Sequence, residues 1–268
     1  MAVTHFQQTI WSKKIQDSLE LKCKLVDNCT REYEGDCKYA NTVKILAVGD
    51  PTIGTYTGAD INIEEMSDAS QLLPIDQRNY FAFLVDDVDK AQSVPGLPEK
   101  FQEKAVHGLA VKRDAYVANL IKSGSNVTTA TARTQEAIKE AIDGAIVALR
   151  ERNFDEDGVI EITPGVYNIF KNNLIELKTA NDDLVKKGVV GMYDNFKVIM
   201  TNGLVKDSTN EYCAVRGAKA IAFAGQINEV EAGRMEKRFA DYIRGLDTFG
   251  AKLIDNSRLQ VVKVPVKA

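Results

Sequence analysis

The stretch from residue 41 to residue 123 constrains the fold most, because it joins a sheet-like projection to one very long helix. Strand-type patterns broken by Gly and Asp lead into the apolar run Tyr80-Phe81-Ala82-Phe83-Leu84-Val85. An uninterrupted helical pattern then runs from about Pro98 to Lys122. Such a projection has much strand edge and little core of its own. We therefore expect another copy of the chain to cover it.

The long helix has clear start and stop signals. Pro98 suits a first helical position, Glu99 complements the amino-terminal dipole, and Gly124 suits the stop. About 25 residues at ~1.5 Å each give a rod of roughly 37 Å. Two interpretations remain open, a core helix or a spine that spans the subunit. Its expected apolar face consists of Phe101, Ala105, Leu109, Tyr116 and Leu120.

The rest of the chain mixes helices and strands, which predicts an α+β fold. Thr134 caps a helix whose apolar positions are Ile138, Ile142, Ala145, Ile146 and Leu149. A second helix opens at Thr163-Pro164 and carries Val166, Phe170, Leu174 and Leu177. Short strands are expected over 159–162, 196–200, 219–224, 239–243, 251–254 and 259–264.

The composition of the chain limits the kinds of molecule that we expect it to bind. The chain has 268 residues, of which 44% are hydrophobic and 27% charged, and its net charge is −4. An acidic balance argues against a reader of nucleic-acid sequence, but not against a wall that encloses nucleic acid. No stretch approaches the ~18 to 20 apolar residues that cross a bilayer, and the start lacks a secretory pattern, so no membrane partner is expected.

The search for catalytic or metal-binding motifs fails, so we expect no catalytic residues, no metal and no cofactor. The only two histidines, His5 and His107, lie in no metal-ligand spacing. The turn 49–54 has the outer spacing of a phosphate loop but lacks its lysine. A calcium loop starting at Asp155 would place Val159 and Val166 at ligand positions.

The remaining candidates for chemistry are carboxylates and thiols. Asp86, Asp87 and Asp89 mark a metal site only if they converge, and solvated carboxylates are the commoner case. The spacing of the four cysteines does not form zinc pairs, and we expect them to be reduced and buried. An alternative of another class stays open, a small α+β enzyme in which the projection serves as a lid.

Several segments together resemble the major capsid proteins of tailed bacteriophages. Residues 80–92 resemble the segment that joins the extended loop to the spine helix in that family. Residues 191–202 are similar to its Gly-x-x-x-Gly-Phe-x-Val-x-x-Ser-Asn strand, with departures at Asp194-Asn195 and Thr201. Residues 220–226, 236–241 and 245–254 resemble its closing strands. The resemblance follows the family's order over nearly the whole chain.

The resemblance implies the Hong Kong ninety-seven-like capsid fold and a division of the chain into five parts. Residues 1–40 would form an amino-terminal arm, 41–80 an extended β loop, and 81–124 the peripheral domain with its spine helix. Residues 125–225 would form the axial domain, and 226–268 would return to the peripheral domain.

The implied function is a coat protein that self-assembles, as pentamers and hexamers, into an icosahedral phage shell enclosing double-stranded DNA. The resemblance also implies a portal, a separate scaffolding protein, non-specific contact with the packaged DNA, and assembly in the cytoplasm of a bacterial host before residence in the virion capsid. An encapsulin-like compartment or a gene-transfer particle would use the same fold for other cargo and remains an alternative.

We expect the loop and the arm to make the contacts between subunits, and the long helix to receive them. The loop candidates are Tyr56, Ile61, Ile63, Glu64, Glu65 and Asp68, and the arm candidates are Trp11 and Ile15. The receiving cations are Lys100, Lys104, Lys112 and Arg113. One exposed ion pair contributes only about 0 to 1 kcal/mol, but a shell repeats it in every subunit.

Charge reversal of the acidic loop tip tests this pairing. Replacing both Glu64 and Glu65 by lysine should impair shell formation while leaving the monomer folded, because it opposes cations to cations. Electron microscopy would measure the particles and circular dichroism the folding. Normal particles from the double variant would rule the pairing out.

Overall fold

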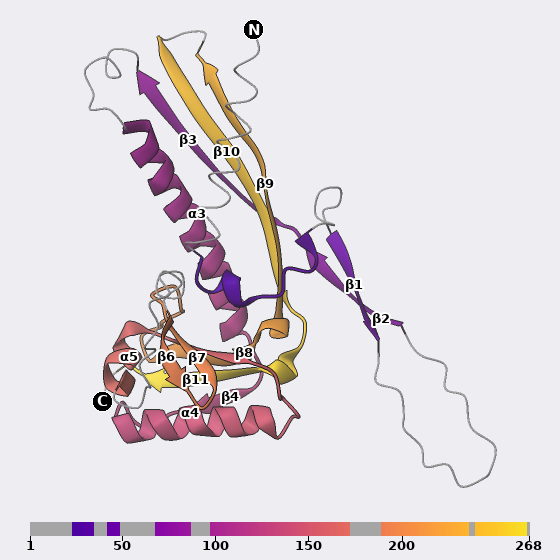
Figure 1. Cartoon of the computed structure of the whole chain (residues 1–268), viewed down its shortest axis with the longest axis vertical. Helices are drawn as coiled ribbons and strands as arrows, with labels where there is room; N and C mark the ends of the chain where they lie inside the picture. The colour runs from indigo at the N-terminus through magenta and orange to yellow at the C-terminus, as the bar shows by residue number, and fades with distance from the viewer. Residues whose placement is uncertain are drawn as a thin grey trace, which may run out of the picture.

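The structure is a computed structural model that describes residues 23–34, 42–48, 68–86, 97–171, 189–235 and 239–266. Its elements form a long three-stranded sheet with one helix beside it, a six-stranded sheet at one end of that helix, and a small two-stranded sheet that projects sideways (Figure 1). This arrangement confirms the predicted α+β class.

The three-stranded sheet, called the ribbon below, consists of β3 (Gln77–Asp86), β10 (Ala240–Leu253) and β9 (Ile221–Arg234), all antiparallel, with β10 in the middle. β10 is one continuous strand of 14 residues where the sequence pattern predicted two short ones. Gly245 and Asp247 break the apolar pattern, but the ring of Phe81 lies over Gly245 and Asp247 is paired internally. These tertiary contacts therefore keep β10 continuous across Gly245 and Asp247.

Helix α3 (Leu97–Lys122) runs beside the ribbon, as the predicted spine does (Figure 1). Its buried face is rotated from the predicted one: Leu109 is buried as expected, whereas Phe101 is exposed and Tyr116 and Leu120 are partly buried. Two polar residues, Arg113 and Asp114, lie on the buried face of α3. Apolar periodicity alone therefore did not predict which face of the helix is buried. The buried residues are Val106, Leu109, Ala110, Arg113, Asp114, Val117, Ala118 and Ile121.

The six-stranded sheet contains strands from distant parts of the chain, in the order β4-β11-β8-β5-β7-β6. Its strands are β4 (Val127–Thr129), β5 (Gly158–Ile162), β6 (Val189–Tyr193), β7 (Phe196–Met200), β8 (Asn210–Gly217) and β11 (Leu259–Pro265). The place of β11 corrects the sequence-based division, which returned the whole of 226–268 to the peripheral part. β9 and β10 do belong to the ribbon, but β11 pairs with β8 and β4.

The middle of the six-stranded sheet is buried on both faces. Along β8, Cys213 and Val215 face one core with helix α4 (Gln135–Arg150), whereas Tyr212 and Ala214 face the other core with α3. A strand covered on both sides has no polar alternation. For this reason the sequence pattern missed β8 altogether.

The two predicted helices of this region are confirmed where the structure describes them. The Thr134 hydroxyl accepts a hydrogen bond from the Ala137 N–H at 3.3 Å and caps α4, and all five predicted apolar positions of α4 are buried. Helix α5 (Pro164–Phe170) begins after Thr163 and buries Val166 and Phe170. Leu174 and Leu177 lie outside the described residues.

The two-stranded sheet covers the base of the ribbon, on the face opposite α3. Strands β1 (Thr42–Val48) and β2 (Asp68–Pro74) pair with each other, and their buried residues Val43, Ile45 and Leu73 pack on Ala222 and Ala224 of β9. The corner after β2 comes so close to β10 that a Cβ on Gly250 would lie 2.0 Å from the Pro74 carbonyl oxygen. Glycine at 250 therefore permits this packing.

Two glycine-to-alanine variants test the close approach. Gly250→Ala should lower the free energy of unfolding by about 1–3 kcal/mol, because the added methyl group displaces backbone. Gly108→Ala is the matched control: no atom lies within 4 Å of its Cβ position, so the substitution should stabilise α3 by roughly 0.5–1 kcal/mol. Chemical denaturation measures both, and equal stabilities for the two variants would contradict the packing.

Candidate subunit interface

The ribbon has one face against α3 and one face that is bare over most of its length. Along β3, Phe81 and Phe83 point toward the helix, and the Phe83 ring stacks on Phe101 at 5.7 Å between centroids. The alternate residues of β3 face away from α3, and Tyr80 and Leu84 are 79% and 43% exposed. Successive side chains of a strand point to opposite faces. Strand β3 is apolar on both faces, but the described residues cover only the face toward α3.

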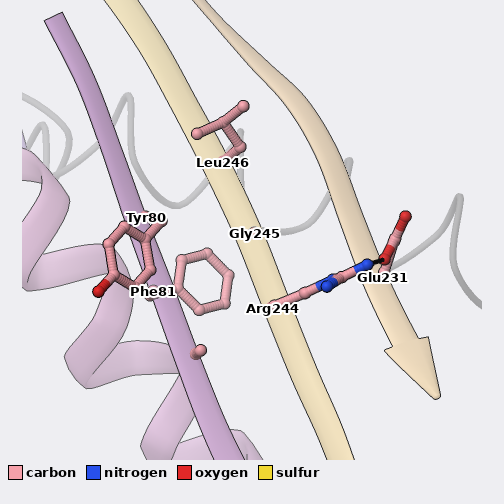
Figure 2. Close-up of a pocket in the computed structure, with 7 residues that line it drawn as sticks. Tyr80, Phe81, Glu231, Arg244, Gly245 and Leu246 are labelled. Carbon is pink, nitrogen blue, oxygen red and sulfur yellow. Dashed lines mark hydrogen bonds and ion pairs between the residues drawn. The ribbon is translucent and has the colours of Figure 1, made fainter.

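The strand register extends the bare surface across the ribbon. Tyr242, Arg244 and Leu246 of β10 lie opposite Leu84, Ala82 and Tyr80 of β3. We call these six residues the open face: Tyr80, Ala82, Leu84, Tyr242, Arg244 and Leu246. A hollow of about 420 Å³ lies on this part of the ribbon. Figure 2 shows residues that line it, among them Tyr80 and Leu246.

One ion pair crosses the open face. The Arg244 guanidinium extends from β10 to Glu231 of β9 and donates an Nε–H···O hydrogen bond of 2.7 Å (Figure 2). The same guanidinium lies 5.5 Å from the centroid of the Tyr242 ring. Both charged side chains are exposed, so the pair contributes only about 0 to 1 kcal/mol in the free subunit. Coverage by another surface would remove water from the pair and strengthen it.

The open face continues a surface that is already covered elsewhere. At the base of the ribbon the same side packs against β1 and β2, with Ala222 and Ala224 buried. Further along, among the described residues, nothing covers Tyr80, Leu84 or Leu246. Exposed apolar patches that are rimmed by polar groups mark interaction sites. The open face is therefore the strongest candidate for a subunit contact in the described part of the chain.

Most of the contact residues expected from the sequence lie outside the described residues: Trp11, Ile15, Tyr56, Ile61, Ile63, Glu64 and Glu65. Asp68 begins β2 and Lys100 lies in the first turn of α3, but their side chains are also outside the description. Lys104 and Lys112 are exposed on α3, as a receiving surface requires.

Arg113 corrects the expected set. Its side chain is buried against the ribbon, where it pairs with Asp247 of β10 through two hydrogen bonds, one of them Nε–H···O at 3.1 Å. Its guanidinium also lies 5.4 Å and 5.7 Å from the ring centroids of Phe223 and Phe249. Arg113 therefore joins α3 to the ribbon and is not a surface cation.

The sequence did not lead to a prediction of the open face, although residues 80–85 carry a signal for it. The run 80–85 is apolar at every position, which requires cover on both faces. The partners of these residues, Tyr242 and Leu246, lie more than 150 residues away in the chain and follow no local pattern with them.

The described residues show little that could perform catalysis. They contain no cluster of three or more His, Cys, Asp or Glu side chains that could hold a metal ion. Burial raises the pKa of the thiols, to about 11 for Cys29 and about 12 for Cys23 and Cys213, so all three are protonated at neutral pH. Among the described helices, none has the length and apolar character of a membrane span.

The ribbon, its long helix, the six-stranded sheet and the projecting strands together define the class: this is the Hong Kong ninety-seven-like capsid fold. A chain from Mycobacterium phage Che8 has a TM-score of 0.71 and 25% identity, over 89% of this chain and 90% of that one. A chain from the capsid of cyanophage P-SCSP1u has a TM-score of 0.65 and 14% identity, over 85% and 84%.

A chain from an empty gene-transfer-agent particle has the same fold, with a TM-score of 0.63 and 9% identity over 92% of this chain and 90% of that one. No family model and no curated protein sequence matches the chain. The fold predicted from the segment resemblances is thus confirmed by structure, across most of the length of each neighbour.

The buried pair between Arg113 and Asp247 yields a stability prediction. Asp247→Asn should lower the free energy of unfolding by about 3–5 kcal/mol, because it leaves a buried guanidinium without its counter-charge. The double variant Arg113→Met/Asp247→Leu removes both charges and should regain most of that loss. Denaturant titration measures each variant; a double variant as unstable as the single one would contradict the explanation.

Proposed function

We propose that this chain is the major coat protein of a tailed phage and that it assembles into an icosahedral shell around double-stranded DNA. The observation that carries the proposal is the likeness of fold over 85% or more of the chain to proteins of phage capsids. The open face supports it independently, because no described residue of the subunit covers this apolar surface. The shell would form from pentamers and hexamers of the one chain.

We further propose that a neighbouring copy covers the open face. Its two leucines and two tyrosines offer apolar area, and Arg244 and Arg234 line its edge, each in an ion pair, with Glu231 and Asp241 respectively. Segment 49–67 of another copy contains Glu64 and Glu65 and is joined at both ends to β1 and β2, which cover the next part of the same side of the ribbon. Lys104 and Lys112 on α3 remain the second receiving surface.

The proposed role is structural, without catalysis. Buried, protonated thiols are poor nucleophiles, and the described carboxylates do not cluster. The inner surface of such a shell would touch DNA without reading it, consistent with the net charge of −4. A scaffolding protein and a portal would complete the assembly in the bacterial cytoplasm, and the finished shell would be part of the virion.

The second candidate is a gene-transfer particle, which the match to a chain from such a particle favours. Both candidates require a shell, so they differ in cargo. Sequencing the nucleic acid that is protected inside particles from the native source distinguishes them: one repeated viral genome supports a phage, and random host fragments support a gene-transfer particle.

Size measurements on the purified protein test the shell itself. Size exclusion with light scattering and negative-stain microscopy should show pentamers, hexamers or closed particles, alone or with a co-expressed scaffolding protein. A monomer that persists at high concentration under both conditions would refute the proposal.

Single charges placed on the open face should block assembly without unfolding the subunit. Leu84→Lys and Leu246→Lys change exposed positions, so stability should shift by no more than about 0.5 kcal/mol. Shell yield should fall sharply, because a lysine would be buried at the contact. Val147→Lys is the control, since Val147 is 53% exposed on α4, far from the ribbon. Normal shells from both leucine variants would show that the open face is not part of the subunit interface.

A further inference from the structure

Residues 23–30, here called the arm root, fill the junction between the ribbon and the six-stranded sheet. Cys23, Leu25, Val26 and Cys29 are buried in one core with residues of α3, β10 and β11. Everything upstream of Cys23 is therefore joined to the subunit at this buried point. The polar contacts of the root show how it is held.

Asp114 of α3 holds the first half of the arm root. One carboxylate oxygen accepts the Lys24 N–H at 2.9 Å, and the other accepts the N–H groups of Leu25 and Val26 at 3.1 and 3.2 Å. Burial raises the pKa of Asp114, and these three backbone donors oppose that rise. A buried carboxylate that accepts three backbone hydrogen bonds serves as a cap for a segment distant in sequence.

Arg216 of β8 holds the second half. It donates to the Leu25 carbonyl at 2.8 Å and to the Asn28 carbonyl at 2.7 Å. Its other N–H groups pair with Glu161 of β5 at 3.0 and 2.8 Å, and Glu161 also accepts from the Asn28 amide at 3.2 Å. Burial lowers the pKa of Arg216, but the charges of Glu161 and Cys29 and the hydrogen bonds to both together outweigh burial and raise the pKa, so the guanidinium stays charged.

The end of the root is held by backbone contacts. Thr30 forms an isolated parallel bridge with Ala222 of β9. Its N–H donates to the Ile221 carbonyl at 3.0 Å, and its carbonyl accepts the Phe223 N–H at 2.9 Å. The root is thus bonded to α3, to the six-stranded sheet and to the ribbon within eight residues.

The charges match the polarity of the turn that they hold. The root contains one 3-10 turn, Val26–Asn28, without a side-chain cap of its own. Asp114 accepts N–H groups at the start of the turn and Arg216 donates to the Asn28 carbonyl at its end, an arrangement that favours a helical turn, and Arg216 also donates to the Leu25 carbonyl at the start. A single turn does not persist alone in water. Its conformation therefore depends on Asp114 and Arg216.

We propose that Asp114 and Arg216 are positioning residues for assembly: they fix the arm root, and so the point at which residues 1–22, which include the expected contact residues Trp11 and Ile15, join the subunit. This inference rests on the proposed shell function. It assigns a role in assembly to two residues that are buried inside the subunit.

Hydrogen exchange tests the anchoring without any need for assembly. In the wild type the amides of residues 24–26 should be protected, although they lie outside any strand or α-helix. Asp114→Asn keeps the side-chain size but loses the charge and one acceptor oxygen, so these amides should exchange at least about tenfold faster. Asp247→Asn, a buried carboxylate that pairs with α3 but not with the root, is the control: its general loss of stability should lower protection at 24–26 no more than at the buried amides of α3, whereas the loss in Asp114→Asn should be greatest at 24–26.

Two results would overturn the anchoring. One is exchange of residues 24–26 at the unprotected rate in the wild-type protein, which requires no variant to fold. The other is a loss of protection in Asp114→Asn that is no greater at residues 24–26 than at the buried amides of α3.

An assembly experiment separates positioning from general stability. Asp114→Asn and deletion of residues 1–22 should each lower shell yield, and the combination should be no worse than the deletion alone, because both act through the arm. A combination that is much worse than the deletion would show a purely structural role and overturn the proposal. Absence of shells from the wild type would refute the proposed function, while the exchange comparison would still judge the anchoring.

Discussion

The structure depends on buried charges that are fully paired where its parts meet. Arg113 with Asp247 joins the long helix to the ribbon, and Arg216 with Glu161 joins the arm root to the six-stranded sheet. A buried ion is tolerated only when its hydrogen-bonding groups are satisfied, and removal of one partner costs several kcal/mol. Apolar packing would tolerate small shifts between these parts, whereas paired fork-shaped guanidinium groups fix both distance and angle. These polar contacts therefore add directional constraints to the apolar core in which helix, ribbon and sheet pack together.

Local signals in the sequence were sufficient for the elements that depend on local interactions. The α3 boundaries follow from Pro98 and the stop near Gly124, and α4 follows from its Thr134 cap and its apolar spacing. The overall fold was accessible only because several weak segments occur in the family's order. No single segment of that set would have been enough, since each resembles many ordinary strands and turns.

The remaining features were inaccessible because they depend on distant partners. β8 is buried on both faces and has no alternation, and β10 passes through Asp247 only because Arg113 neutralises it. Arg113 itself was expected at the surface, since arginine side chains are mostly exposed unless they pair with a buried carboxylate. The same limitation hid the open face, whose halves lie on β3 and β10.

The interior and the exterior of the subunit thus differ in a way that bears on assembly. Inside, the buried Arg113, Asp114, Glu161, Arg216 and Asp247 each have a partner within hydrogen-bond distance. Outside, Tyr80 and Leu246 remain exposed on a ribbon whose neighbouring section is covered by β1 and β2. The polar groups inside the subunit are already paired. The apolar surface that association could still bury lies on the open face. A fold that is complete at its junctions and incomplete on one face favours association of rigid units.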